Sequence, residues 1–201
     1  MPSPVAPGLY AHFSTSLGDF TARLFEQEAP NTVANFVGLA EGTKEFTDPK
    51  SGAKAKRPFF DGLVFHRVIP EFMIQGGDPA GDGSGDAGYY LKDEIDPALT
   101  FSVPGRLAMA NSGPDTNGSQ FFITEQAFSD LNGKYTIFGQ CDAPSVQLVM
   151  AIARVPRNKD DKPLTPIYIN RVTIVRDGQP MPPVPSAAPT VSTAPPAPVA
   201  P

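Results

Sequence analysis

The sequence predicts a mainly β fold, a closed antiparallel barrel with two α-helices over its open ends. Short segments with alternating apolar and polar residues outnumber segments with helical spacing, which indicates many strands and few helices. The 201 residues are 40% hydrophobic, which is enough for one sizeable core. A β-sandwich fits the same periodicity almost as well, so the pattern alone leaves that alternative open.

The first strands are predicted to form a hairpin. Phe20, Ala22 and Leu24 alternate with polar neighbours, and a Leu17-Gly18 turn separates them from residues 10–16. Further strands are predicted at 64–69, 72–75, 107–110, 121–124, 136–139 and 167–175.

Two segments have helical spacing instead. Apolar residues recur at 33, 36, 37 and 40, after Pro30 and before Gly42, which are typical start and stop residues. The same spacing recurs at 146, 149, 150 and 153, where Ser145 is the predicted N-cap. The sequence therefore predicts two helices.

Charge and proline content set the predicted domain boundaries. Residues 1–16 and 179–201 contain no Asp, Glu, Lys or Arg, and the last 23 residues hold nine of the 24 prolines. We interpret residues 9–178 as one folded domain. Residues 1–8 are predicted to be a flexible lead, and residues 179–201 a disordered Pro/Ala-rich tail.

The net charge and the apolar runs exclude some classes of partner. The formal net charge is −5, from 16 basic and 21 acidic residues, which argues against binding to nucleic acid. No apolar run approaches the roughly 18–20 residues of a membrane span, so we expect no membrane partner. The first residues lack a signal peptide's basic and apolar regions, so we expect a cytoplasmic protein. A periplasmic or secreted form whose signal was removed is the alternative.

Few residues are suited to metal or redox chemistry. Cys141 is the only cysteine and cannot form an intramolecular disulfide. His12 and His66 lack partners at ligand spacing. We therefore expect no metal site and no cofactor, and we interpret Cys141 as a buried small apolar residue.

Residues 83–88 match the G-x-G-x-x-G pattern, but no helical spacing follows them. A dinucleotide site needs a strand before this pattern and a helix after it, so we interpret the segment as a surface loop. Asp78, Asp82 and Asp86 miss the spacing of an EF-hand calcium loop.

Two long strings are more specific. Residues 65–78 read FHRVIPEFMIQGGD, and residues 109–124 read MANSGPDTNGSQFFIT. Together with LNGK at 131–134 and FG at 138–139, they closely resemble the cyclophilin family of peptidyl-prolyl cis–trans isomerases, over about residues 10–177. The resemblance implies an eight-stranded closed barrel capped by two helices, with a substrate groove on its outer surface. It also implies an enzyme that accelerates X–Pro rotation in proline-containing peptides and in unfolded or folding proteins.

The same resemblance implies roles for individual residues. Arg67 would be the principal catalytic residue. The pocket for the substrate proline ring would be formed by Phe72, Met73, Phe122 and Leu131. The further substrate contacts would be His66, Gln75, Ala110, Asn111, Gln120 and Tyr135. By residue type alone, the apolar four would be ordinary core, and Arg67 a solvated surface charge.

Strand periodicity gives a separate argument for part of this arrangement. Alternate residues of a strand point to the same face, so Met73 shares a face with Gln75, and Gln120 shares a face with Phe122. Phe72 has the opposite parity to Met73. It must therefore reach the groove from the turn before the strand, which periodicity does not establish.

The sequence departs from the best-known eukaryotic members at three places. Asp130 stands where those members carry a tryptophan that contacts cyclosporin, and Tyr135 stands where they often have histidine. We therefore expect weak cyclosporin binding with activity retained. The long segment 43–58, rich in Lys and Gly, is expected to be an exposed loop. Such features are more familiar in bacterial members.

Two other classes of function compete with the enzyme. A non-catalytic proline-peptide-binding or chaperone module would keep the apolar pocket, but it has less need of the charge on Arg67. A scaffold that presents the Pro-rich tail to SH3-like partners is less favoured, because no Arg or Lys flanks the P-x-x-P spacings in 179–201. We expect a monomer.

Overall fold

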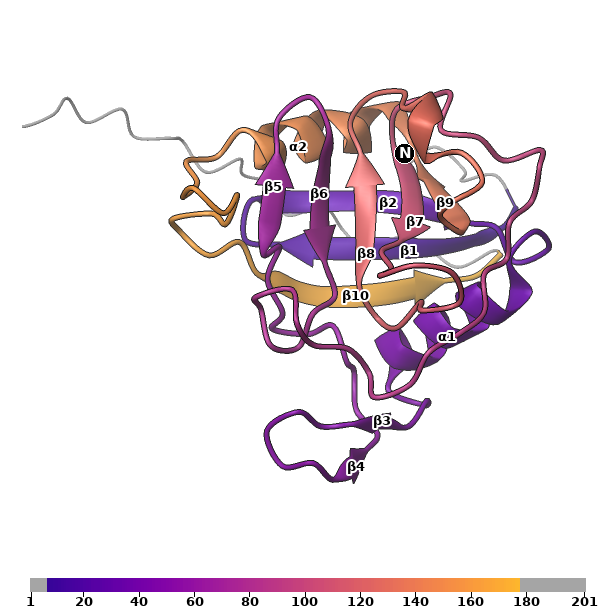
Figure 1. Cartoon of the computed structure of the whole chain (residues 1–201), viewed down its shortest axis with the longest axis vertical. Coiled ribbons are helices and arrows are strands. Elements are labelled where there is room, and N and C mark those ends of the chain that lie inside the picture. Colours follow the sequence, from indigo (N-terminus) through magenta and orange to yellow (C-terminus); the bar gives the residue numbers. More distant parts are fainter. Residues whose placement is uncertain (1–6, 178–201) are drawn as a thin grey trace, which may run out of the picture.

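The computed structural model describes residues 7–177, so the predicted tail and residues 1–6 of the predicted lead lie outside the described residues. Eight strands form one antiparallel sheet in the order β10-β1-β2-β9-β7-β8-β6-β5 (Figure 1). They are β1 (Leu9–Thr15), β2 (Gly18–Leu24), β5 (Arg67–Ile69), β6 (Met73–Gly76), β7 (Arg106–Met109), β8 (Phe121–Thr124), β9 (Ile137–Cys141) and β10 (Ile169–Val175). The helices are α1 (Pro30–Glu41), α2 (Ala143–Ala153) and the short 3-10 helix η1 (Ser129–Leu131).

The prediction of a closed barrel is wrong. The sheet is an open half-barrel that turns through 219°, and its edge strands β10 and β5 are not paired with each other. β5 has only three residues, and its Val68 N–H donates to the carbonyl of Asp161 over 2.8 Å. A loop therefore takes the position that β10 would need for closure. Just before β5, the chain pairs with the start of β10 instead. The Phe65 N–H donates to the carbonyl of Ile167, the Gly62 N–H donates to the carbonyl of Ile169, and the Ile169 N–H donates to the carbonyl of Leu63. A bridge also joins Val64 to Tyr168.

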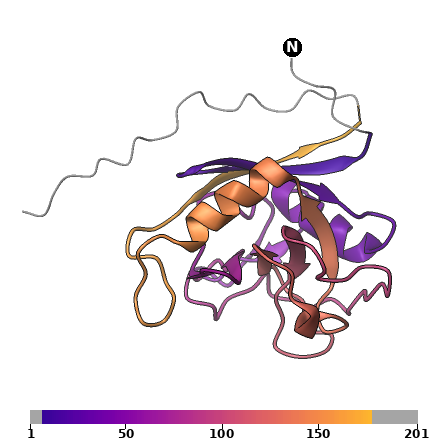
Figure 2. The ribbon, with the colours of Figure 1, turned by 90° about the horizontal axis from the view of Figure 1, so that it is seen from above.

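The two helices lie at opposite ends of the curved sheet (Figures 1 and 2). Helix α1 starts at Pro30 and ends before Gly42 at φ +74°, as the sequence predicts. Helix α2 is capped by Asp142, whose carboxylate accepts the Ser145 N–H over 2.8 Å, so the prediction of Ser145 as N-cap is wrong. The Ser145 hydroxyl instead accepts the N–H of Thr21 on β2. Within residues 7–177, no helix is long and apolar enough to cross a membrane.

Phenylalanine rings fill the main core. Phe13 stacks on Phe20 with ring centroids 4.5 Å apart, and Phe36 lies 4.8 Å from Phe60. Phe121 meets both Phe36 and Phe60 edge-on. Such edge-to-face and offset contacts add to the free energy gained by burial alone. Cys141 is also buried in this core, and burial raises the pKa of its thiol, so the sequence interpretation of this residue is confirmed.

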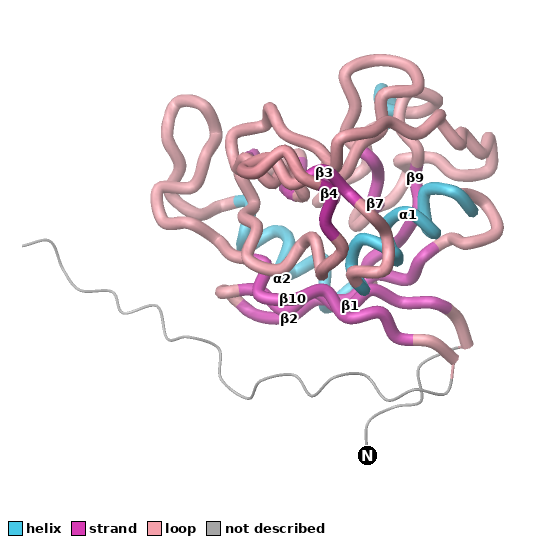
Figure 3. The backbone as a smooth tube through the Cα atoms, turned by 90° about the horizontal axis from the view of Figure 1, so that it is seen from below, coloured by secondary structure: helices cyan, strands magenta, loops and turns pink. Residues whose placement is uncertain are grey.

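The segment predicted as an exposed loop, 43–58, contains a short hairpin of β3 (Phe46–Thr47) and β4 (Lys54–Ala55) (Figure 3). The hairpin extends away from the main sheet (Figure 1). Its anchor is the buried ring of Phe46, which meets Phe59 edge-on at 4.8 Å. The Arg57 guanidinium lies over the same ring and donates to Asp48. The segment is exposed at its tip but structured at its base.

Gly42 and Gly52 both have positive φ, but the space around them differs. Substituting each by alanine therefore distinguishes the cost of backbone strain from the cost of a steric clash. A Cβ at Gly42 would lie 2.5 Å from the carbonyl carbon of Arg57, whereas a Cβ at Gly52 (φ +69°) would meet nothing within 4 Å. We expect Gly52→Ala to cost about 1 kcal/mol of unfolding free energy, and Gly42→Ala about 2–4 kcal/mol. Urea unfolding of both variants measures the difference. Equal losses would contradict the close approach at Gly42.

Candidate functional site

Three strands present a row of side chains on one face of the sheet. In the strand register, Arg67 on β5 lies opposite Gln75 on β6, and Gln75 lies opposite Phe122 on β8. Directly opposed residues point to the same face, with Cβ atoms about 4.5–5.5 Å apart. A cation, an amide and an aromatic ring therefore follow one another across the sheet.

An apolar cluster lies on the same face, separate from the main core. It includes all four residues expected at the proline pocket: Phe72, Met73, Phe122 and Leu131. Met73 and Phe122 are 2% and 5% exposed, while Phe72 and Leu131 are only partly buried. The cluster thus has a buried floor and an accessible rim.

Phe72 reaches this cluster from the turn between β5 and β6. Its N–H donates to the carbonyl of Ile69 over 3.2 Å, with Pro70 and Glu71 between them. Glu71 has φ +62°, and proline followed by a residue of positive φ is the pattern of a type II turn. Outside glycine, this left-handed conformation costs about 1–2 kcal/mol. The Phe72 ring then packs edge-on against Phe128, with centroids 4.9 Å apart.

The Arg67 side chain is exposed, and its guanidinium makes no hydrogen bond or ion pair to another residue of 7–177. Its neighbour His66 is buried at 5% exposure, and the Nδ1 of that ring has no hydrogen-bond partner in the described part of the chain. Burial lowers the pKa of His66; the Asp78 carboxylate opposes this, and the Lys162 and Arg67 cations add to it. The guanidinium of Arg67 is therefore a free charge on this face, next to the buried ring of His66.

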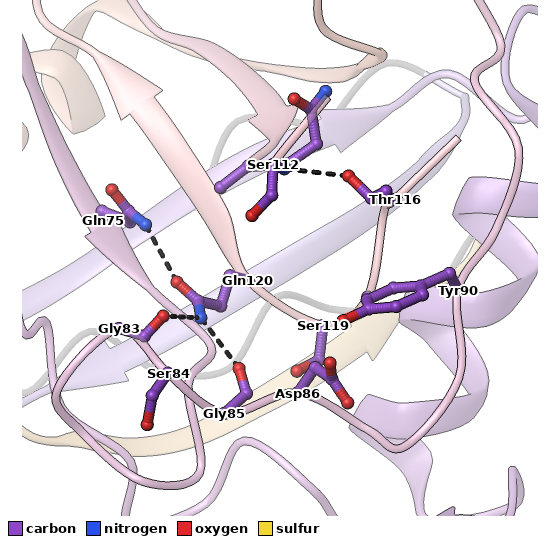
Figure 4. Close-up of a pocket in the computed structure, with 13 residues that line it drawn as sticks. Gln75, Gly83, Ser84, Gly85, Asp86, Tyr90, Ser112, Thr116, Ser119 and Gln120 are labelled. Carbon is purple, nitrogen blue, oxygen red and sulfur yellow. Dashed lines mark hydrogen bonds between the residues drawn. The ribbon is translucent and has the colours of Figure 1, made fainter. Parts of the chain in front are cut away.

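Two glutamine side chains are fixed by a chain of hydrogen bonds. The Gln75 amide nitrogen donates to the Gln120 side-chain oxygen over 2.9 Å. The Gln120 amide nitrogen donates to the carbonyls of Gly83 and Gly85 over 2.9 Å and 2.8 Å (Figure 4). The loop that carries these two carbonyls thus orients both amides.

That loop is organised by a buried carboxylate that the sequence analysis did not recognise as structural. Asp78 is 1% exposed. Its oxygens accept the backbone N–H groups of Ala80, Asp82, Gly83 and Gly85. The glycine-rich pattern therefore surrounds an internal anion, as backbone N–H nests do. The available signal was an acidic residue just before a run of glycines.

A mainly polar hollow (Figure 4) adjoins the apolar cluster at Ala110, which lines the hollow and packs against the cluster. Four of the expected site residues line it: Gln75, Ala110, Asn111 and Gln120. The Ala110 N–H donates to the Gln120 carbonyl over 3.0 Å, and the Asn111 side-chain nitrogen donates to the carbonyl of Lys134 over 3.1 Å. Tyr135, on the apolar side, meets the Phe122 ring edge-on at 5.3 Å.

The sequence analysis missed three aromatic members of the apolar cluster, Phe25, Phe101 and Phe128. Phe101 stacks parallel to Phe122 at 5.9 Å, and Phe128 packs against Phe72. All three lie in irregular segments, where side-chain direction has no period. Nothing in the sequence pattern could have indicated them.

Known proteins resemble this chain closely. A family model described as cyclophilin type peptidyl-prolyl cis-trans isomerase/CLD matches residues 10–174. The peptidyl-prolyl cis-trans isomerase A of Mycobacterium tuberculosis is 50% identical over 173 residues, which is 86% of this chain and 94% of the relative. The peptidyl-prolyl cis-trans isomerase B of Streptomyces anulatus is 48% identical over 172 residues, covering 85% and 98%.

Solved structures resemble the fold as well. A cyclophilin type peptidyl-prolyl cis-trans isomerase of Cryptosporidium parvum superimposes with a TM-score of 0.70 and 35% identity, covering 84% of this chain and 98% of that one. The same protein in the presence of the dipeptide Ala-Pro gives a TM-score of 0.69 and 34% identity, covering 84% and 99%.

The lowered pKa of His66 predicts a dependence of stability on pH. Burial holds this pKa below its ordinary value, so the unfolded chain takes up the proton first as the pH falls. Above about pH 6.5 both states are neutral and the contribution vanishes; below about pH 6.5 it destabilises the fold. We expect His66→Asn to flatten the loss of unfolding free energy between about pH 6.5 and about pH 5. Urea unfolding across this range tests it, and parallel curves for the two proteins would refute it.

Proposed function

The chain belongs to the cyclophilin family of peptidyl-prolyl cis–trans isomerases, and we propose that Arg67 is the catalytic residue with which it rotates X–Pro bonds. The observation that carries this proposal is the row of Arg67, Gln75 and Phe122 beside the apolar cluster. A free guanidinium there shares one face with a surface suited to a proline ring.

The reaction needs no nucleophile. Rotation about an X–Pro bond breaks amide resonance, at a barrier of roughly 18–20 kcal/mol. As the bond twists, the prolyl nitrogen becomes pyramidal and regains its lone pair. A hydrogen bond from Arg67 to that nitrogen, or to the twisting carbonyl, stabilises the twisted amide more than either planar form. Such differential binding lowers the barrier.

The apolar cluster would hold the proline ring during this rotation. Met73 and Phe122 supply a rigid floor, and Phe72 and Leu131 supply the rim, with Tyr135 against the edge of Phe122. Once the ring is bound, the substrate shields Arg67 from water, which strengthens its hydrogen bond to the reacting amide. A relative's structure in the presence of Ala-Pro supports proline-containing peptides as ligands.

The preceding part of the peptide would lie across Ala110 and Asn111 in extended form. Ala110 lines the polar hollow, so the side chains before the proline would enter it. Gln75 and Gln120 are held in one orientation by the loop carbonyls, and a fixed amide loses little entropy when a substrate binds. We infer that unfolded and folding proteins are the clients, because such chains expose extended X–Pro segments.

The competing function is a proline-peptide-binding or chaperone module without turnover. It would need the apolar cluster but would gain little from a cation opposite Gln75. The absence of an ion pair from Arg67 to any residue of 7–177 favours catalysis, because the charge is available to the substrate.

Arg67→Ala separates the two functions. We expect kcat/KM on an Ala-Pro peptide to fall about 10²–10³-fold, as for loss of other donors to a transition state, while peptide affinity changes little. Arg67→Lys should also be slow, because the planar fork is lost. Arg171→Ala on β10, whose side chain is 73% exposed, is the matched control and should keep wild-type activity. Near-normal turnover in Arg67→Ala would remove Arg67 from the mechanism.

Cyclosporin affinity tests the rim of the pocket. Asp130 lies exposed in η1 and offers a carboxylate where an indole would supply apolar contact and an N–H donor. We expect weak binding by calorimetry, and Asp130→Trp should tighten it by at least about tenfold. Isomerase activity should be unchanged. Tight binding by the unmodified chain would contradict this account of the rim.

A further inference from the structure

The turn between β5 and β6 holds an aromatic wall of the pocket in a costly backbone conformation. Glu71 adopts φ +62° without being glycine, and the next residue is Phe72. Any relaxation of Glu71 toward negative φ would swing the Phe72 ring, because the two residues share a peptide bond. Something must therefore hold Glu71 in place.

Glu125, directly after β8, binds this turn through both its side chain and its backbone. Its carboxylate oxygen Oε1 accepts the Glu71 N–H over 2.5 Å. Its own N–H donates to the Phe72 carbonyl over 3.0 Å. The Glu125 side chain is 0% exposed, so these bonds are sheltered from competing water.

Arg154 holds the carboxylate in turn. Its Nη1 donates to Oε2 of Glu125 over 2.7 Å, and its Nη2 donates to Oε1 over 3.0 Å. Arg154 follows the last residue of α2, and its Nη1 also donates to the carbonyl of Met150 in that helix. A forked pair of this kind fixes direction as well as distance. The end of α2 is thereby connected to the β5–β6 turn.

We propose that Glu125 is a positioning residue that sets the affinity for the substrate proline by fixing Glu71 at positive φ and Phe72 at the pocket rim. This inference rests on the proposed function, because it needs Phe72 to contact the proline ring. Glu125 itself does not touch the substrate. Its loss should therefore raise KM and leave the chemical step at Arg67 intact.

The test first replaces Glu125 by an isosteric amide. It then replaces Glu71 by glycine, which needs no such support to keep a positive φ. Glu125→Gln should raise the dissociation constant and KM for an Ala-Pro peptide about three- to tenfold, with kcat within about twofold of normal. Glu71→Gly should restore affinity in the Glu125→Gln background, because glycine adopts positive φ without strain. Glu71→Ala removes the same carboxylate without freeing the backbone, so it is the matched control and should not restore affinity.

A purely structural role for the ion pair predicts a different pattern. Glu125→Gln would then lower the melting temperature while affinity stayed normal, or Glu71→Gly and Glu71→Ala would act alike. Either result overturns the proposal. Should Glu125→Gln fail to fold, Arg154→Lys replaces it in all arms; it keeps a charge but loses the fork, so it should weaken binding about two- to threefold. The same rescue by glycine and not by alanine is required.

Phe72→Ala distinguishes failure of this inference from failure of the proposed function. If Phe72→Ala weakens peptide binding and Glu125→Gln does not, the proline ring does bind at the apolar cluster, but Glu125 has no positioning role. If neither variant changes binding, the proline ring does not bind at this face, and both proposals fall.

Discussion

The two-residue period of β6 and β8 links the groove to the core. Ile74, Phe121 and Ile123 point into the main core, while Met73 and Phe122 point to the apolar cluster on the other face. A shift of either strand by one residue would exchange these sets and would bury the polar site residues among phenylalanine rings. The groove is therefore as rigid as the aromatic packing behind it. Rigidity of this kind suits a catalyst that works by differential hydrogen bonding to a twisted amide.

Buried carboxylates shape the backbone on two sides of the groove. Asp78 gathers four N–H groups of the glycine-rich loop, whose carbonyls then orient Gln120. Glu125 holds the Glu71 N–H at the β5–β6 turn. Neither acid faces the substrate in the proposed arrangement. Both act by accepting hydrogen bonds from backbone N–H groups of irregular segments.

Local periodicity was enough to predict most of the regular structure. The paired strands around Gln75 and Phe122 and the two helices were found because their apolar residues repeat at 2 or 3.6 positions. Closure of the barrel could not be predicted from local periodicity. It depends on whether β10 or the loop carrying Asp161 pairs with the edge strand at Val68, and these segments are far apart in the sequence. The cap at Asp142 was missed because Ser145, three residues on, is also a common cap residue.

The same distinction applies to the candidate site: features set by local periodicity could be predicted, and features set by irregular or distant segments could not. The common face of Met73 and Gln75 follows from parity, and the register places Arg67 beside them. Phe128 and Phe101 entered the apolar cluster from irregular segments, where no period sets the direction of a side chain. The role of Glu125 was out of reach, because its carboxylate accepts a backbone N–H from Glu71, which is far away in the sequence. The role of Asp78 is local, and the acidic residue before the run of glycines was its signal.

The seclusion of Cys141 has a practical consequence. Cys141 is 3% exposed, and burial raises the pKa of its thiol. Maleimides and similar reagents attack thiolates, so they have no target on the folded domain described here. A cysteine engineered at the exposed Ser129, beside Leu131, can then carry a single fluorophore without removal of the native thiol. Binding of a peptide can then be measured as a change in the emission of a fluorophore at the rim of the pocket.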